Sequence, residues 1–145
     1  MRWEGPDGYF ASDDGSLVDI ERVHEWLSGE SYWAAGRPYE VMAQAIENSL
    51  VVGLYSADSG QAGLARFVTD YATFAWLCDV FVDSAHRGQG LGTFLVRTAI
   101  GHPAVRDLRQ VLATAPERSL YRRLGYGNLV SPERWMERPA QGDAR

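Results

Sequence analysis

Apolar residues near the start of the chain recur at helical spacing. Those within 20–27 fall on one face three and four residues apart, which predicts an amphipathic helix that Asp19 caps. The run 38–48 repeats this spacing, and Pro38 suits a first helical turn. Two helices are therefore expected, separated by a loop, 31–37, that carries two large aromatic residues.

The middle of the chain changes to apolar runs of strand length. The runs 50–55, 61–69 and 73–82 are joined by short polar turns, which predicts three antiparallel strands. Strict alternation in the third run predicts one face with Ala75, Leu77, Asp79 and Phe81 and another with Trp76, Cys78, Val80 and Val82. Asp79 is thus expected on a face that is otherwise apolar.

A glycine turn follows the third strand and reads Arg87-Gly88-Gln89-Gly90-Leu91-Gly92. An amphipathic helix begins there. Glycine lets a ligand approach the backbone closely, and the first N–H groups of a helix are free to bind an anion. The turn therefore predicts an anion site, most simply for a pyrophosphate. A P-loop would end in Gly-Lys-Ser/Thr, and a Rossmann fingerprint would lie in a βαβ unit near the chain start, so neither fits.

Shorter elements complete the pattern. A weak strand is expected at 8–11. The apolar segment 110–114 returns after the glycine-turn helix, so it should run parallel to the strand 73–82. The last expected elements are a helix at 117–124, strands at 126–130 and 135–138, and a polar tail at 139–145. We therefore expect one domain over residues 1–138.

Composition narrows the class of protein. The 145 residues are 46% hydrophobic, which suits one domain with a real core. The net charge of −5 argues against a nucleic-acid partner. The only cysteine, Cys78, allows no disulfide framework, and no residues have metal-ligand spacing. The start lacks a secretory apolar region and no run could span a bilayer, so we expect a soluble, cytoplasmic protein without membrane contact.

The order of these elements resembles the GCN5-related N-acetyltransferase (GNAT) family over nearly the whole chain. The turn Arg87–Gly92 matches that family's Q/R-x-x-G-x-G/A loop, and Leu120–Tyr126 is similar to its L-Y-x-x-x-G-F/Y signature. The stretch Val68–Val82 resembles a bacterial subgroup whose substrate is usually unassigned. The resemblance implies an α/β (α+β) fold, with a mixed, mostly antiparallel central sheet and helices on both faces.

The resemblance also implies a cosubstrate, acetyl-CoA. The backbone of Val80, Phe81 and Val82 would contact the pantetheine arm, in a gap between splayed strands. The remaining cofactor contacts would come from Arg87, Gly88, Gln89, Gly90, Leu91, Gly92, Thr93 and Ser119. Many members carry an asparagine seven residues before the signature tyrosine. Thr114 stands there in this chain.

The implied reaction is direct acetyl transfer to an amine of a small molecule or a protein. The N–H near Val80 would polarise the thioester carbonyl, and Tyr121 would protonate the departing thiolate. An ammonium group must lose a proton before it attacks, so a base or a water chain is needed. Asp79 is the first candidate and Glu117 the second. Asp79 could equally anchor the amine or make a structural bond, and Tyr121 could simply pack in the core.

The acceptor is expected beside Tyr32, Trp33, Trp76 and Asp79. These aromatics and the acidic chain favour a cationic, partly apolar amine. Cys78 could in principle carry an acetyl group, but a small buried residue is the simpler interpretation. A non-catalytic acyl-CoA-binding module and a ligand-free interaction domain are the competing functions. The oligomeric state is left open, with a homodimer as one option.

Overall fold

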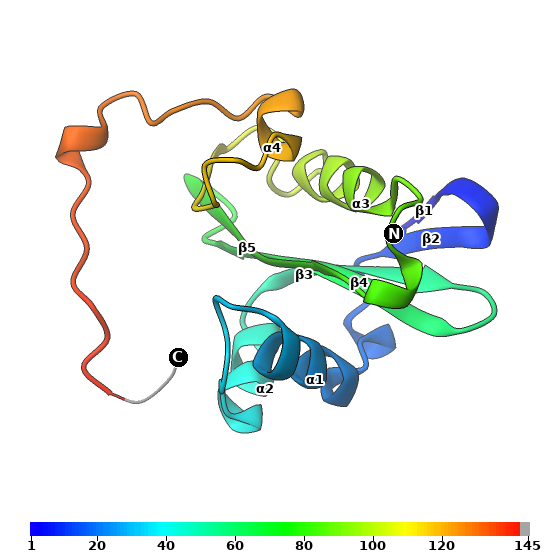
Figure 1. The fold of residues 1–145 in the computed structure, drawn as a ribbon. Coiled ribbons are helices and arrows are strands. Elements are labelled where there is room, and N and C mark those ends of the chain that lie inside the picture. The colour runs from blue at the N-terminus through cyan, green and yellow to red at the C-terminus, as the bar shows by residue number, and fades with distance from the viewer. Residues whose placement is uncertain (143–145) are drawn as a thin grey trace.

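A six-stranded sheet forms the centre of the computed structural model, which describes residues 1–142 (Figure 1). The strands, adjacent in the sheet in chain order, are β1 (Arg2–Glu4), β2 (Tyr9–Ser12), β3 (Leu50–Ser56), β4 (Gly60–Thr69), β5 (Phe74–Val82) and β6 (Arg109–Leu112). Neighbours are antiparallel except β5 and β6, which are parallel. The mixed, mostly antiparallel sheet and its three-stranded meander are therefore confirmed.

Helices cover both faces of this sheet (Figure 1). They are α1 (Ile20–Glu30) and α2 (Tyr39–Glu47) on one face, and α3 (Leu91–Ile100) and the short α4 (Leu120–Arg123) on the other. The Asp19 side chain accepts a hydrogen bond from the Arg22 N–H, so it caps α1 as predicted. Within residues 1–142, no helix has the length and apolar character needed to cross a bilayer.

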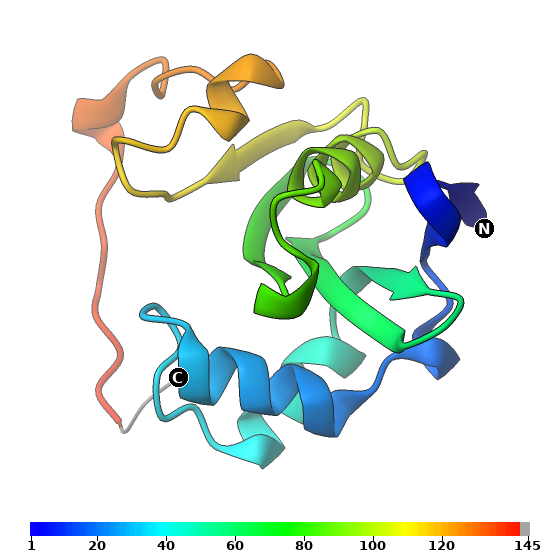
Figure 2. The same cartoon turned by 45° about the vertical axis from the view of Figure 1, so that its right-hand side comes forward.

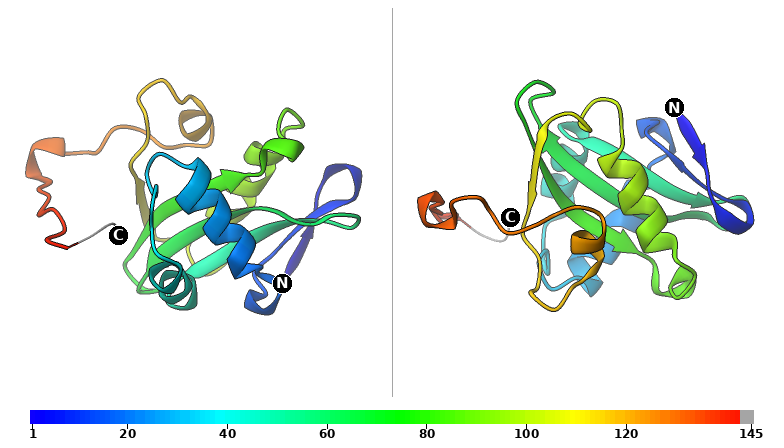
Figure 3. Two further views of the ribbon diagram at one scale, coloured as in Figure 1. Left: turned by 60° about the horizontal axis from the view of Figure 1, so that its bottom comes forward. Right: turned by 90° about the horizontal axis from the view of Figure 1, so that it is seen from above.

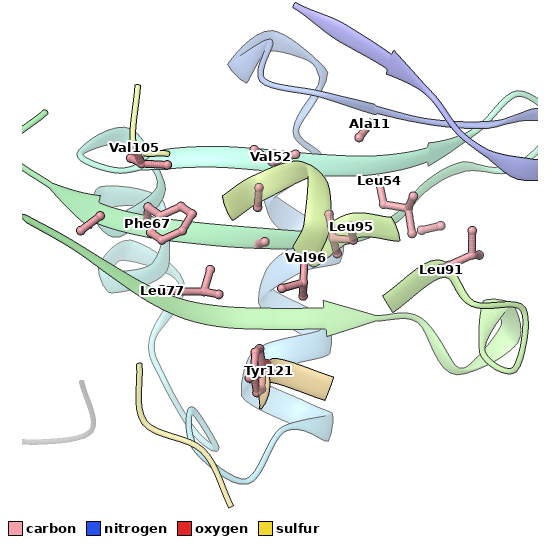
Figure 4. Close-up of a cluster of buried hydrophobic side chains, with 14 residues drawn as sticks. Ala11, Val52, Leu54, Phe67, Leu77, Leu91, Leu95, Val96, Val105 and Tyr121 are labelled. Atoms are coloured by element: carbon pink, nitrogen blue, oxygen red, sulfur yellow. The ribbon is translucent and has the colours of Figure 1, made fainter. Parts of the chain in front are cut away.

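Two apolar clusters hold these layers together. The cluster between the sheet and α3 includes Val52, Phe67, Leu77, Leu95 and Val96, and Figure 4 shows the Tyr121 ring at its edge. The cluster on the other face packs α1 and α2 against β4 and β5. Both faces of the central strands are thus buried, so those strands are rigid supports for whatever lies at their ends.

A β-bulge in β5 corrects the predicted alternation of its side chains. Leu64 pairs with Phe81 but Arg66 pairs with Cys78, so β5 has one extra residue there. Asp79 has a φ of 48°, which Asp tolerates better than most residues. Leu77 lies in the cluster under α3, whereas Phe81 lies in the cluster under α1 and α2. The prediction that both share a face is wrong, because the bulge turns the strand over.

The chain ends differ from the sequence expectation. A hairpin partner, β1, was missed, and the expected helix at 117–124 is only α4. The predicted strands at 126–130 and 135–138 are wrong: this segment leaves the sheet, with Val130 93% and Met136 97% exposed (Figures 2 and 3). Gly, Asn and Pro in this segment are poor strand formers. Of the expected tail, 139–142 form no helix or strand, and 143–145 lie outside the described residues.

Candidate active site

The glycine turn presents a row of backbone donors. Gly88 and Gly90 have φ values of 82° and 75°, a left-handed conformation that glycine adopts without strain. Gly90 is the N-cap of α3. No N–H group from Gly88 to Thr93 donates a hydrogen bond to another described residue. Because these donors lie at the positive end of the α3 dipole, the turn suits an anion.

Gly92 adds a sign that a ligand approaches this turn. Its φ is not in the left-handed region, and a Cβ added there would meet no atom within 4 Å. Neither backbone strain nor internal packing requires glycine at this position. The free donors and the open space both fit the pyrophosphate that the family loop implies.

A cavity of about 400 Å³ opens in front of this turn. It is bounded by the glycine turn, the end of β5, the loop after α1 and α4. Arg87 lies at its wall, where its Nε donates to the Val82 carbonyl at 2.8 Å. Of the expected cofactor residues, Gln89, Thr93 and Ser119 do not line it, and the Ser119 hydroxyl instead accepts a hydrogen bond from Arg123.

A second cavity, of about 280 Å³, lies where β5 and β6 part. Their pairing ends at Leu77 and Leu112, so the rest of β5 has no partner on this side within the described chain. The cavity is lined on one side of the fork by Trp76–Val80 of β5 and on the other by 112–114. The two cavities share Tyr32, Trp33, Val80, Arg118 and Tyr121. They therefore meet at the bulged end of β5.

Tyr121 stands at this junction as a potential proton donor. Its ring is buried in the α3-side cluster and makes an edge contact with Tyr126, with 6.2 Å between ring centroids. Its hydroxyl makes no hydrogen bond to another residue of 1–142. Burial raises the pKa of Tyr121, although nearby Arg118 opposes the change. The phenol is therefore protonated at neutral pH.

Asp79 is held by three donors rather than exposed to a substrate. Its Oδ2 accepts hydrogen bonds from Arg37 Nη1 at 2.9 Å and Arg66 Nε at 2.8 Å. Its Oδ1 accepts one from Trp33 Nε1 at 2.9 Å. The carboxylate is buried, and we call Asp79, Arg37 and Arg66 the charged cluster. It ties the loop after α1 to β4 and β5.

The electrostatics of the charged cluster weaken Asp79 as a base. Burial alone would raise the pKa of the Asp79 carboxyl, but the charges of Arg66 and Arg37 and the hydrogen bonds lower it overall. A carboxylate with a lowered pKa is a poor proton acceptor. Glu117, the second candidate, is exposed and lines neither of the two cavities.

The expected substrate-binding aromatics lie together. Tyr32, Trp33 and Trp76 all line the second cavity, and each keeps part of its side chain exposed. Cys78 is also there, and burial raises the pKa of its thiol to about 11. A thiol with that pKa is almost entirely protonated at neutral pH, so Cys78 is a poor acyl carrier.

Three arginines of the second cavity were missed from the sequence: Arg37, Arg66 and Arg118. Arg66 is a charged residue in an otherwise apolar run of β4, and Asp79 is the matching charged residue on the next strand. Two opposite charges on adjacent, otherwise apolar strands were a readable signal for an ion pair. Arg37 and Arg118 lie in loops, where nothing local marks them.

Comparison with known proteins identifies the family. The sequence model of the acetyltransferase (GNAT) domain matches residues 47–127, which span β3 to the end of α4 and hold both the glycine turn and Tyr121. The chain belongs to this family. The fold is that of the acyl-CoA N-acyltransferases, as the resemblance implied.

Particular relatives carry acetyltransferase names. The chain is 32% identical to histone acetyltransferase TAP1 of Glycine max over 137 residues, which covers 83% of this chain and 58% of that protein. It is 29% identical over 115 residues to a protein of Gibberella zeae named as an acetyltransferase, covering 67% of this chain and 64% of the relative. The chain thus spans about six tenths of the length of these two relatives.

Solved structures agree with this assignment. A GNAT-family protein of Xanthomonas campestris pv. campestris superposes with a TM-score of 0.89 at 38% identity, covering 97% of this chain and 99% of that one. An acetyltransferase-fold protein of Clostridium acetobutylicum, solved with acetyl-CoA, has a TM-score of 0.61 at 14% identity and covers 96% of each chain. The latter match shows the fold alone.

Proposed function

We propose that this protein transfers an acetyl group from acetyl-CoA to a primary amine by direct attack. One observation carries the proposal. Gly88, Gly90, Leu91 and Gly92, whose N–H groups have no partner among the described residues, line a cavity that continues, past Val80 and Tyr121, into a second cavity with different chemistry. A cofactor in the first cavity and an acceptor in the second would bring their reactive groups together at that junction.

The glycine turn would hold the pyrophosphate of the cofactor. When bound, acetyl-CoA supplies an activated acetyl thioester. The N–H groups from Gly88 to Thr93 donate to the phosphate oxygens, and Arg87 adds positive charge at the same wall. The edge of β5 beyond the fork, Val80–Val82, offers unpaired backbone groups to the pantetheine amides.

Val80 and Tyr121 would carry the chemical step. Asp79 and Val80 lie in the bulge, between the pairs Leu64–Phe81 and Arg66–Cys78, and the Val80 N–H would donate to the thioester carbonyl. The Tyr121 hydroxyl is free, protonated and at the junction of the cavities. It donates its proton to the thiolate sulfur as the carbon–sulfur bond breaks.

In this proposal, positive charge in the second cavity makes the bound amine lose its proton. Asp79 is fully engaged with Trp33, Arg37 and Arg66. The charge of Arg118, which lines the same cavity and is not paired with Asp79, disfavours an ammonium ion and lowers the pKa of the bound amine. Solvent can then accept the proton, and Asp79 serves as a positioning residue that holds the arginines. Glu117 as the base is the alternative, and Glu117→Gln with an unchanged pH–rate profile would exclude it.

The test combines a binding and a rate measurement. Coenzyme A at 100 times its Kd should stabilise the fold by about 2.7 kcal/mol, which a thermal melt detects. Thiol release from acetyl-CoA is then followed with small amines, amino acids and, given the name of the soybean relative, a histone-tail peptide. A melting shift without thiol release would favour a non-catalytic acyl-CoA-binding module. No shift would exclude both functions.

A further inference from the structure

The second cavity carries more positive charge than its carboxylate balances. Arg37, Arg66 and Arg118 line it, and Asp79 is the one acidic residue among the described residues that do so. Arg37 and Arg66 each have 10% of their side chains exposed, and both bind the same oxygen of Asp79. One carboxylate cannot neutralise two guanidinium groups. A buried surplus of charge is costly unless a further anion pairs with it.

The same arginines have hydrogen-bond donors to spare. A guanidinium has five N–H donors. Within residues 1–142, the Arg37 side chain donates only to Asp79, and its Nε is buried with no partner. Arg66 donates through Nε to Asp79 and through Nη1 to the Ser49 hydroxyl. The Nη2 groups of Arg37 and Arg66 have no hydrogen bond within residues 1–142 and are not among its buried unpartnered atoms, so a second anionic acceptor could use them and balance the charge.

The rest of the cavity wall is apolar, and the cavity is small. Trp33, Trp76 and Leu112 line it beside the arginines. Its volume of about 280 Å³ lies just below the range of roughly 300–1,000 Å³ typical of small-molecule pockets, so it suits a compact acceptor. These walls favour a ligand with an apolar or aromatic side, next to the group that the arginines bind.

We infer that the acceptor is a small amine bearing a carboxylate and an apolar side chain, as an apolar or aromatic amino acid does, and that Arg37 and Arg66 bind the carboxylate. The inference rests on the proposed acetyl transfer. It differs from the cationic amine that the overall acidic charge favours, because the cavity has the opposite sign. A carboxylate carries one negative charge, which matches the surplus of the charged cluster. A phosphate offers the same chemistry with more charge.

Matched acceptors test this selectivity. L-Phenylalanine and phenethylamine share the amine and the ring, and only the first has a carboxylate. We expect kcat/KM for phenylalanine to be higher by about 100-fold or more, since phenethylamine leaves the spare donors of Arg37 and Arg66 without an acceptor. A ratio near one would overturn the inference. A second pair, 2-aminoethyl phosphate and ethanolamine, distinguishes the anion: a larger ratio for this pair would overturn the carboxylate.

Variants of Arg37 connect the selectivity to the charged cluster. Arg37→Met should raise KM for phenylalanine by about tenfold or more and reduce the ratio of kcat/KM for phenylalanine to kcat/KM for phenethylamine. Arg37→Lys keeps the charge and should recover part of that ratio. Arg97→Met is the matched control, because Arg97 is exposed on α3 and lines neither cavity. Its ratio should equal that of the wild type. The melting shift with CoA shows that each variant is folded.

A binding measurement separates this inference from the proposed function. 3-Phenylpropionate has the ring and the carboxylate but no amine, so it cannot be acetylated. When 3-phenylpropionate is titrated into the CoA-loaded protein in a calorimeter, it should bind. Its affinity should fall with added salt and should fall about tenfold in Arg37→Met. The affinity of 3-phenylpropanol should be the same in the variant and the wild type. Binding without turnover of any amine would overturn only the transferase. Turnover of amines without selective binding of 3-phenylpropionate would overturn only the carboxylate site.

Discussion

The two cavities that meet at Tyr121 are constructed differently. In the first, the wall that suits an anion is one continuous stretch of backbone, in which Gly88, Gly90, Leu91 and Gly92 are near neighbours in sequence. The second is lined by side chains from distant segments: Asp79 on β5 binds Trp33 and Arg37, which precede it by 46 and 42 residues, and Arg66, which precedes it by 13. One end therefore depends on local conformation and the other on tertiary packing.

This difference has a functional meaning. Backbone donors do not change when side chains are substituted, so the proposed cofactor end tolerates sequence change as long as the turn keeps its shape. The proposed acceptor end depends on individual charges and rings, such as Arg37 and Trp76, and each can change separately. The same cofactor site can thus be combined with different acceptors. The following predictions test this contrast, from the largest effect to the smallest.

The largest effect should come from the charged cluster. Asp79→Asn leaves Arg37 and Arg66 buried without a counter-charge. We expect a loss of about 3–5 kcal/mol of folding free energy at pH 7, measured by urea denaturation. The control is Asp107→Asn, whose carboxylate is 87% exposed and 3.6 Å from Arg106. It should change stability by less than about 0.5 kcal/mol.

The Asp79 contribution should also depend on pH. The pKa of Asp79 is lowered in the folded protein, so its stabilisation is full above the unfolded value of about 3.9 and is lost as pH falls through the folded pKa. The stability difference between wild type and Asp79→Asn should therefore shrink below about pH 4. A difference that stays constant from pH 7 to pH 3 would contradict an ionised, ion-paired Asp79.

A substitution of Tyr121, at the junction of the cavities, should change the rate of acetyl transfer rather than the stability of the fold. Tyr121→Phe removes a hydroxyl that has no partner among the described residues, so the free energy of unfolding should change by less than about 0.5 kcal/mol. If Tyr121 is the acid, kcat falls by about 100-fold while the CoA affinity holds. Tyr71→Phe, in an exposed turn, is the control and should leave kcat unchanged. An unaltered kcat in Tyr121→Phe would make that ring purely structural.

Gly92 separates binding from folding at the cofactor end. Gly92→Ala improves helix propensity in the first turn of α3, so stability should rise by up to about 1 kcal/mol. Its methyl group occupies the space in front of the turn, so the CoA affinity should fall about tenfold, or about 1.4 kcal/mol by calorimetry. Gly29→Ala in α1 is the matched control, with the same free space and no cavity contact. Equal CoA affinities for the two variants would exclude a phosphate at the turn.

Ser119 should give the smallest effect. Its hydroxyl accepts a hydrogen bond from Arg123 at 2.8 Å and does not line the first cavity. We therefore expect Ser119→Ala to change the CoA affinity by about twofold or less. A loss comparable to that of Gly92→Ala would show that α4 moves onto the cofactor when it binds.

The conformation of the proposed cofactor end could be predicted from the sequence because it depends on residues that are adjacent in the chain. The turn at Arg87–Gly92 and the helix after it are set by adjacent residues, and both formed where the pattern predicted them. The sheet was predictable for the same reason, since short turns join β3, β4 and β5. The phosphate role of the turn stays a prediction, as does the acid role of Tyr121.

The acceptor end was only partly predictable. Tyr32, Trp33 and Trp76 were expected there and do line the second cavity. Arg37 and Arg118 were not, because loop residues leave no periodic signal in the chain. Arg66 was missed although its charge stands out within an apolar strand. The bulge at Asp79 was missed as well. A prediction from strict alternation of side chains assumes that the strand has no inserted residue. The strands predicted at 126–130 and 135–138 are wrong because this segment does not pack on the sheet, and apolar residues such as Val130 are exposed there.

The bulge also limits how this site can evolve. Because side chains alternate with a period of two, removing one residue near Asp79 would move every later residue of β5 to the opposite face. Phe81 would leave its core cluster, and Val80 would no longer face the junction. Point substitutions can therefore change which acceptor fits, but the position of the reactive backbone depends on strand length. An insertion or deletion in this strand, more than any exchange of side chains, would separate one lineage of the fold from another.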